Sequence, residues 1–206
     1  MGYENLASEE AVKKTVEAVQ GRGIAAEVVN TKEEALSRLM DLIPAGSVVM
    51  TGGSLTLTQI GLDEVLISGK HPWRNFKNDL LAEKDPVKQS ALRLQSTLVE
   101  YYLGGVNAIA ETGELVWASA TGSQLPAYAF TSKNVIWVAG TQKITPSLEE
   151  ALQRIREYVL PKEDQRQKSL GNKNGSFIGR ILIFEREPAF LHRNLRLILV
   201  NEILGI

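Results

Sequence analysis

The stretch NVIWVAG, Asn134–Gly140, is an apolar run without the alternating polar positions of a strand that faces solvent on one side. Such a run is typical of a strand buried on both faces of a sheet. Other apolar strand patterns, such as SVVMT at 47–51 and LRLILVN at 195–201, alternate along the chain with helical patterns. The alternation predicts an α/β fold with a mainly parallel sheet covered by helices.

Composition and charge narrow the class of protein. The chain has 206 residues, of which 44% are hydrophobic, so we expect a single domain over residues 1–206. Lysine plus arginine (23) nearly balance aspartate plus glutamate (24), which argues against nucleic-acid binding. No cysteine is present, which excludes disulfides, thiolate catalysis and cysteine metal sites. Neither an export signal nor a membrane span is recognisable, and we expect a cytoplasmic protein.

Several segments between these strands have their own signals. Residues 69–87 show no clean period and many turn-forming residues, which predicts a flap, and polar residues 161–179 predict a mobile loop. Residues 106–118, VNAIAETGELVWA, predict a strand pair about a Thr-Gly turn. A further helix that ends at Gly104 is predicted by an apolar stripe of Ala91, Leu94, Leu98 and Tyr101.

The stretch VVMTGGSLTL, residues 48–57, has the composition of a ligand-binding turn. In open parallel sheets ligands bind at the carboxyl ends of strands, and here a strand runs into Gly52 and Gly53. The glycines allow close approach of the backbone, and the following helix start and hydroxyl groups would donate hydrogen bonds to an anion. The alternative is an ordinary turn with Ser54 as the helix N-cap, and for this turn alone it is the better-supported interpretation.

Three other turns share this chemistry: ETGE at 111–114, ATGSQ at 120–124 and AGTQK at 139–143. We expect the turns to converge on one anion site with Glu111 as its carboxylate and catalytic group, although each turn taken singly is better explained as ordinary turn chemistry. The expected ligand contacts are Thr51, Gly52, Gly53, Ser54, Thr56, Thr112, Gly113, Thr121, Gly122, Ser123, Gln124, Gly140 and Lys143. No metal site is predicted, because His71 and His192 have no partner at metal-ligand spacing.

Four stretches, taken in order, resemble the lactate-utilisation (LUD) domain family: residues 43–62, 104–116, 134–161 and 195–206. The resemblance covers nearly the whole chain. It implies a three-layer α/β fold similar to the group of ribose-5-phosphate isomerase, glucosamine-6-phosphate deaminase (NagB) and CoA transferases. It also implies a role around the oxidation of lactate to pyruvate, in which iron–sulfur partner proteins carry the electrons.

The chain departs from the family pattern at two places. The turn at 119–124 has Ser119, Ser123 and Gln124 where similar family members have an aspartate and end in Asn-Arg. Loss of the arginine removes a bidentate donor for carboxylate or phosphate. Residues 170–179 contain none of the cysteines that those members carry there.

These observations lead to two functional hypotheses. In the first, the protein binds a small carboxylate or phosphorylated metabolite in lactate or organic-acid utilisation, and Glu111 performs acyl or carboxylate chemistry related to that of CoA transferases. In the second, it is a non-catalytic accessory or regulatory subunit that needs partner proteins. The sequence specifies no cofactor, and a homodimer is compatible with either hypothesis.

Overall fold

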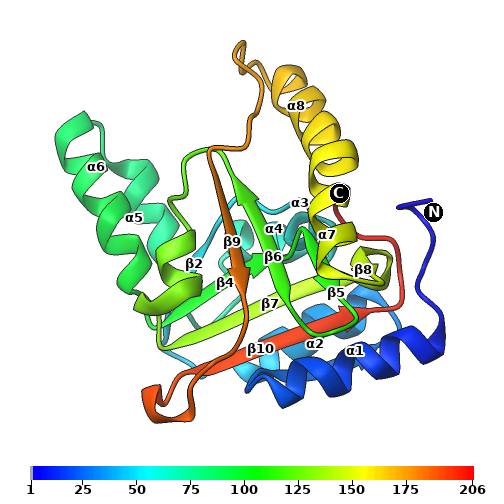
Figure 1. The fold of residues 1–206 in the computed structure, drawn as a ribbon. Helices are drawn as coiled ribbons and strands as arrows, with labels where there is room; N and C mark the ends of the chain where they lie inside the picture. Colours follow the sequence, from blue (N-terminus) through cyan, green and yellow to red (C-terminus); the bar gives the residue numbers. More distant parts are fainter. Residues whose placement is uncertain (1) are drawn as a thin grey trace.

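The computed structural model describes residues 2–206, which fold into two sheets with helices on their outer faces (Figure 1). Within these residues the large sheet has six strands, and every pair of neighbours is parallel. In spatial order the strands are β1 (Ala25–Val29), β10 (Asn194–Val200), β7 (Asn134–Gly140), β4 (Tyr101–Gly105), β2 (Val48–Thr51) and β3 (Arg74–Asn75). The predicted α/β class with a mainly parallel sheet is confirmed.

A second, smaller sheet lies on one face of the large one. Its order is β8 (Ile144–Thr145), β5 (Ala108–Ala110), β6 (Leu115–Ser119) and β9 (Arg180–Phe184). β5 and β6 are the predicted hairpin, with Ile109 opposite Leu115. Figure 1 shows β6 and β9 crossing the strands of the large sheet steeply, so the hairpin forms an additional layer.

Helices complete the layers. They are α1 (Glu9–Gly21), α2 (Lys32–Leu42), α3 (Leu55–Gln59), α4 (Leu62–Ser68), α5 (Phe76–Ala82), α6 (Pro86–Gln95), α7 (Leu148–Arg154) and α8 (Leu160–Ser169). A π-helical turn, Ile155–Val159, joins α7 to α8. The helix starts follow local chemistry: the Ser8 and Thr31 hydroxyls accept hydrogen bonds from the backbone N–H groups of Ala11 and Glu34.

The two faces of the large sheet have separate apolar cores. On the outer face, Leu39 of α2 and Leu57 of α3 pack with Ile136 of β7. On the inner face, Trp137 of β7 packs with Trp117 of β6, with ring centroids 4.9 Å apart. β7 therefore contributes successive side chains to both cores, as its unbroken apolar pattern predicts.

A third core lies on the far side of the small sheet. Ala108 and Val116 of the hairpin pack there against Ala151 of α7 and Ile155 and Val159 of the π turn. This packing holds the α7–α8 arm over the small sheet, close to the carboxyl edge of the large one (Figure 1).

The prediction that a helix runs through Tyr101 and ends at Gly104 is wrong. α6 ends at Gln95, and Tyr101–Gly105 is strand β4, between β2 and β7. Leu94 and Leu98, the middle of the supposed buried stripe, are 73% and 66% exposed. Tyr102 and Leu103 are instead buried on opposite faces of the sheet, and pairing with two strands outweighs the local helical pattern.

The two segments without a clear sequence pattern, residues 69–87 and 161–179, contain helices and a short strand. Much of residues 161–179 belongs to α8, so the expected loop is wrong for that part. Polar pairs such as Lys168–Asp164, 2.6 Å apart, stabilise this helix without an apolar face. The segment 69–87 includes β3 and α5, and Trp73 is buried there, donating from Nε1 to Ile43 O at 3.0 Å. Closure of this segment as a flap stays a prediction.

No helix among residues 2–206 combines the length and the apolar character needed to cross a membrane.

Candidate functional site

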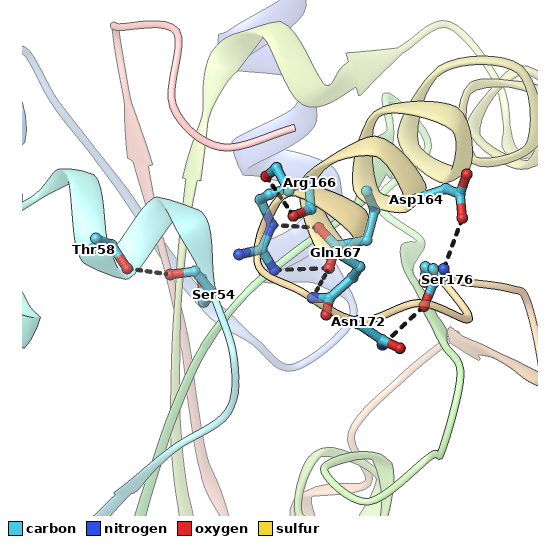
Figure 2. Close-up of polar contacts among 10 residues, drawn as sticks. Ser54, Thr58, Asp164, Arg166, Gln167, Asn172 and Ser176 are labelled. Atoms are coloured by element: carbon cyan, nitrogen blue, oxygen red, sulfur yellow. Dashed lines mark hydrogen bonds and ion pairs between the residues drawn. The ribbon is translucent and has the colours of Figure 1, made fainter.

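A cavity of about 540 Å³ lies at the carboxyl edge of the large sheet. Four neighbouring strand ends contribute to its lining: Gly53 after β2, Gly105 of β4, Lys143 after β7 and Gly205 after β10. Parallel strands bring these ends together even though the residues are distant in sequence. Figure 2 shows the other wall, where Arg166 of α8 lies across from Ser54 of the β2–α3 turn.

Lys143 is the most unusual group in this cavity. Its side chain is buried at 3% exposure, and Nζ donates to Thr56 Oγ1 at 3.1 Å and to Val106 O at 2.9 Å. No carboxylate among residues 2–206 lies within ion-pair distance of it. Burial, together with the nearby positive charge of Arg154, lowers the pKa of Lys143 to about 7.

A glycine packs directly against the Lys143 amine. Gly205 has φ +71°, and a Cβ built there would lie 2.7 Å from Lys143 Nζ and would also collide with Thr56 Oγ1. The left-handed backbone and the close approach both require glycine at this position.

The β2–α3 turn combines both interpretations offered by its sequence. Ser54 is the N-cap of α3, because its Oγ accepts from Leu57 N at 3.3 Å, and it also lines the cavity. A Cβ at Gly53 would meet no atom within 4 Å, so this glycine opens onto free space. Thr58, one turn along α3, donates from Oγ1 to Ser54 O at 3.2 Å (Figure 2).

The turn at 119–124 also faces the cavity, with Ser119, Thr121, Ser123 and Gln124 in the lining. Ser119 Oγ accepts from Gly122 N at 2.9 Å and donates to Gln124 Oε1 at 3.2 Å. Gly122 itself, at φ +73°, shapes the turn and does not line the cavity. This turn therefore contributes neutral hydroxyl and amide groups to the cavity lining.

The sequence analysis did not identify the polar residues of α8 that line the cavity, Glu163, Arg166 and Gln167. Arg166 of α8 donates from Nε and Nη2 to both carboxylate oxygens of Glu163, each at 2.7 Å, and these hydrogen bonds raise its pKa. Gln167 donates to the same carboxylate at 2.8 Å. The three-residue spacing of Glu163 and Arg166 was a helical signal, but the surrounding polar residues favoured a loop.

Arg93 was also missed. It lies on α6, lines the cavity and is exposed, and its guanidinium has no hydrogen-bond or ion-pair partner within the described part of the chain. Its place in the sequence, on a helix far from any glycine turn, offered no signal that it would reach this cavity.

The ETGE turn lies elsewhere, so its expected convergence with the other turns is wrong. Glu111 pairs with Lys14 of α1 at 2.9 Å, and Thr112 O accepts from Arg22 Nε at 2.8 Å. Gly113, at φ +96°, packs against the backbone of Ala18. The reason is the antiparallel hairpin, whose turn points toward α1 while its other end, with Asn107 and Ala118, lines the cavity.

Three other predicted contacts do not line the cavity: Thr51, Gly52 and Gly140. Thr51 Oγ1 accepts from Lys77 Nζ at 3.3 Å. Gly52 faces Gln124 and the hydroxyls of Tyr102 and Tyr128, with its built Cβ at 3.7–3.8 Å from each. No group of three or more His, Cys, Asp or Glu among residues 2–206 is arranged to hold a metal ion.

The structure predicts that alanine is far more destabilising at one of the glycines than at another. A Cβ at Gly140 would collide with Gln142 Oε1 and Glu202 O and lie 2.8 Å from Leu204 N. Gly140→Ala is therefore expected to destabilise the protein by roughly 1–3 kcal/mol, and Gly53→Ala by less than about 0.5 kcal/mol. Denaturant unfolding of both variants measures this, and equal losses of stability would contradict it.

The lowered pKa of Lys143 predicts a pH-dependent stability. Between about pH 7 and its ordinary value of 10.5, the amine is neutral in the folded chain and protonated in the unfolded chain. The unfolded state then binds the extra proton, so stability rises with pH by up to about 1.4 kcal/mol per pH unit. Below pH 7 both states are protonated and this slope vanishes.

The measurement is the difference between the free energies of unfolding of wild type and of Lys143→Met at each pH. The contributions of other titrating groups cancel in this difference. We expect this difference to increase by roughly 2 kcal/mol between about pH 7.5 and about pH 9.5. A difference that stays constant over this interval would show that the Lys143 amine titrates normally.

Comparisons with known proteins agree with this fold. The family model described as the LUD domain matches residues 12–180. A DUF162 family protein from Deinococcus radiodurans has a similar solved structure, with a TM-score of 0.52 and 14% identity, covering 95% of this chain and 98% of that one. None of the curated proteins compared with the chain matches it.

Two further solved structures are more distant. Ribose 5-phosphate isomerase from Plasmodium falciparum has a TM-score of 0.38 and 13% identity, covering 85% of this chain and 96% of that one. The eIF2B beta subunit from Chaetomium thermophilum has a TM-score of 0.41 and 15% identity, covering 58% and 44%. Since the family model spans most of the chain, from within α1 to the first residue of β9, the protein belongs to the LUD domain family.

Proposed function

We propose that the protein binds a small anionic metabolite, with a carboxylate or phosphate group, in the cavity at the carboxyl edge of the large sheet. The observation that carries this proposal is the Arg93 guanidinium, which lines the cavity and has no hydrogen-bond or ion-pair partner among residues 2–206. Arginine matches the planar, bidentate geometry of carboxylate and phosphate oxygens. The cavity lining also contains hydroxyls and amides, such as those of Ser54, Thr121 and Gln167, which suit the remaining polar groups of such a ligand.

The balance of charge in the cavity supports an anionic ligand. Glu163 is the only carboxylate side chain among the described residues that line it, and both of its oxygens are occupied by Arg166. Arg93 is then a positive charge without a counterion, and Lys143 adds a second one whenever it is protonated. An anion would complete the pairing that the protein leaves open.

Membership in the LUD domain family supports a place for this binding in the utilisation of lactate or related organic acids. Glu111 does not line the cavity, so a ligand there would not contact it, and the proposal does not use it as a catalytic group. Binding of an anion in this cavity is compatible with both hypotheses, a catalytic protein and a non-catalytic accessory subunit.

Arg93→Gln tests the proposal. The purified protein is titrated by calorimetry with lactate, pyruvate, inorganic phosphate and ribose 5-phosphate, and we expect at least one of these anions to bind saturably. Removal of a charge-assisted hydrogen bond to that anion should lower its affinity about tenfold, because about 1.4 kcal/mol corresponds to a factor of ten. Affinity should also fall as salt is raised.

The matched control is Arg186→Gln. Arg186 is exposed like Arg93, but it does not line the cavity, so its loss should leave the affinity unchanged. Equal affinities of wild type and Arg93→Gln, or saturable binding by none of the four anions, would refute the proposed site.

A further inference from the structure

The environment of Lys143 differs from that of every other lysine among the described residues. Among residues 2–206 it is the only buried lysine, whereas others such as Lys14 and Lys162 lie at the surface in ion pairs. A lysine buried only to stabilise a fold usually has a carboxylate partner, because an unpaired buried charge is costly. Lys143 has none, and it lines a cavity together with Thr56 and Val106, the two residues that accept hydrogen bonds from its nitrogen.

The hydrogen bonds of Lys143 suit a neutral amine better than an ammonium ion. A neutral amine has two N–H donors, and Thr56 Oγ1 and Val106 O accept two hydrogen bonds from Nζ. In this arrangement the third position on nitrogen is an electron pair rather than a proton. An ammonium would instead have a third N–H without a partner among residues 2–206.

We propose that Lys143 is a nucleophilic amine that forms an imine with a small carbonyl compound bearing a carboxylate or phosphate, such as a 2-oxo acid. This inference rests on the proposed anion-binding function, because the anionic group is what Arg93 and the hydroxyl groups would hold. It adds a covalent site and restricts the ligand to aldehydes and ketones.

The charges around Lys143 favour the reactive form of the amine. Burial first, and then the positive charge of Arg154, lower the pKa of Lys143 to about 7, so a large fraction is unprotonated at neutral pH. Arg154 is itself fully buried, and its Nε and Nη2 have no hydrogen-bond partner in the described structure. Among the described residues, the other charged side chains that line the cavity are those of Arg93, Arg166 and Glu163, and the last two neutralise each other.

The reaction is balanced without a cofactor. The electron pair of Lys143 Nζ attacks the carbonyl carbon, and the carbonyl π electrons move to oxygen, which gives a carbinolamine. The two N–H protons, donated to Thr56 and Val106 before the reaction, leave with that oxygen as water. The nitrogen then forms a C=N bond to the former carbonyl carbon. No oxidant or reductant is consumed.

Reductive trapping tests the inference. The protein is incubated with pyruvate or with glyceraldehyde 3-phosphate in the presence of cyanoborohydride, which reduces an imine to a stable secondary amine. Intact-mass measurement and peptide mapping then locate the adduct. We expect one reduced adduct per chain at Lys143 with at least one probe, formed well before surface lysines react.

Two variants provide the comparison. Lys143→Met should lose the single fast adduct, whereas Lys77→Met should keep it. Lys77 is a matched control because its Nζ also donates to a threonine hydroxyl beside a strand end, that of Thr51, but it does not line the cavity. If Lys143→Met fails to fold, the peptide map of the wild-type protein alone decides the position of the adduct.

The pH profile separates a nucleophile from a structural lysine. The rate of adduct formation at Lys143 should rise to half of its plateau near pH 7, whereas the rate at exposed lysines should continue to rise toward their ordinary pKa of 10.5. Arg154→Met should move the midpoint of the rate profile for Lys143 to higher pH, because the positive charge of Arg154 lowers the pKa of Lys143.

The outcomes distinguish this inference from the proposed function. If an anion binds saturably in calorimetry but neither carbonyl probe gives a preferential adduct at Lys143, the imine inference is wrong and the binding site stands. If no anion binds and labelling is spread over surface lysines, both are wrong. A fast adduct at Lys143 that is lost in Lys143→Met supports the inference.

Discussion

The structure depends on the burial of strand β7 between two parallel neighbours. All seven of its residues are buried, and it pairs along its whole length with β10 and over five residues with β4. Because these strands are parallel, their carboxyl ends emerge at one edge. That edge holds the glycines of β4 and of the segment after β10, with Lys143 between them. The site is therefore a consequence of how the core is built.

Burial of Lys143 is the main energetic peculiarity of the site. Removing an amine from water is unfavourable, and the two hydrogen bonds to Thr56 Oγ1 and Val106 O offset only part of the loss. The chain thus maintains a group with a lowered pKa at a cavity, and groups of this kind are concentrated at functional sites. Because Gly205 has no Cβ, the backbone can pack directly against the Lys143 amine and contribute to its burial.

The errors made from sequence have a common physical origin. The local pattern predicts a helix that includes Tyr101 and a loop at residues 161–179. A local pattern does not reveal which strands or side chains will contact a segment, and those contacts determine its structure. In the structure, β4 is stabilised by pairing on both sides and α8 by ion pairs along its own surface. Glu111 shared its composition with the other turns, but an antiparallel hairpin directs its turn away from the parallel strand ends.

The sequence by itself determined the α/β class, the family, the hairpin and the glycine turn at Gly53, because hydrophobic period, turn chemistry and ordered motifs act over short stretches of chain. Lys143 was also found this way, as a polar residue just after a buried strand. Only the tertiary structure decided that Arg93 of α6 and Arg166 of α8 line the same cavity and that the ETGE turn does not. It also decided that Lys143 is buried without a carboxylate, since pKa and charge pairing depend on residues that are neighbours in space but distant in sequence.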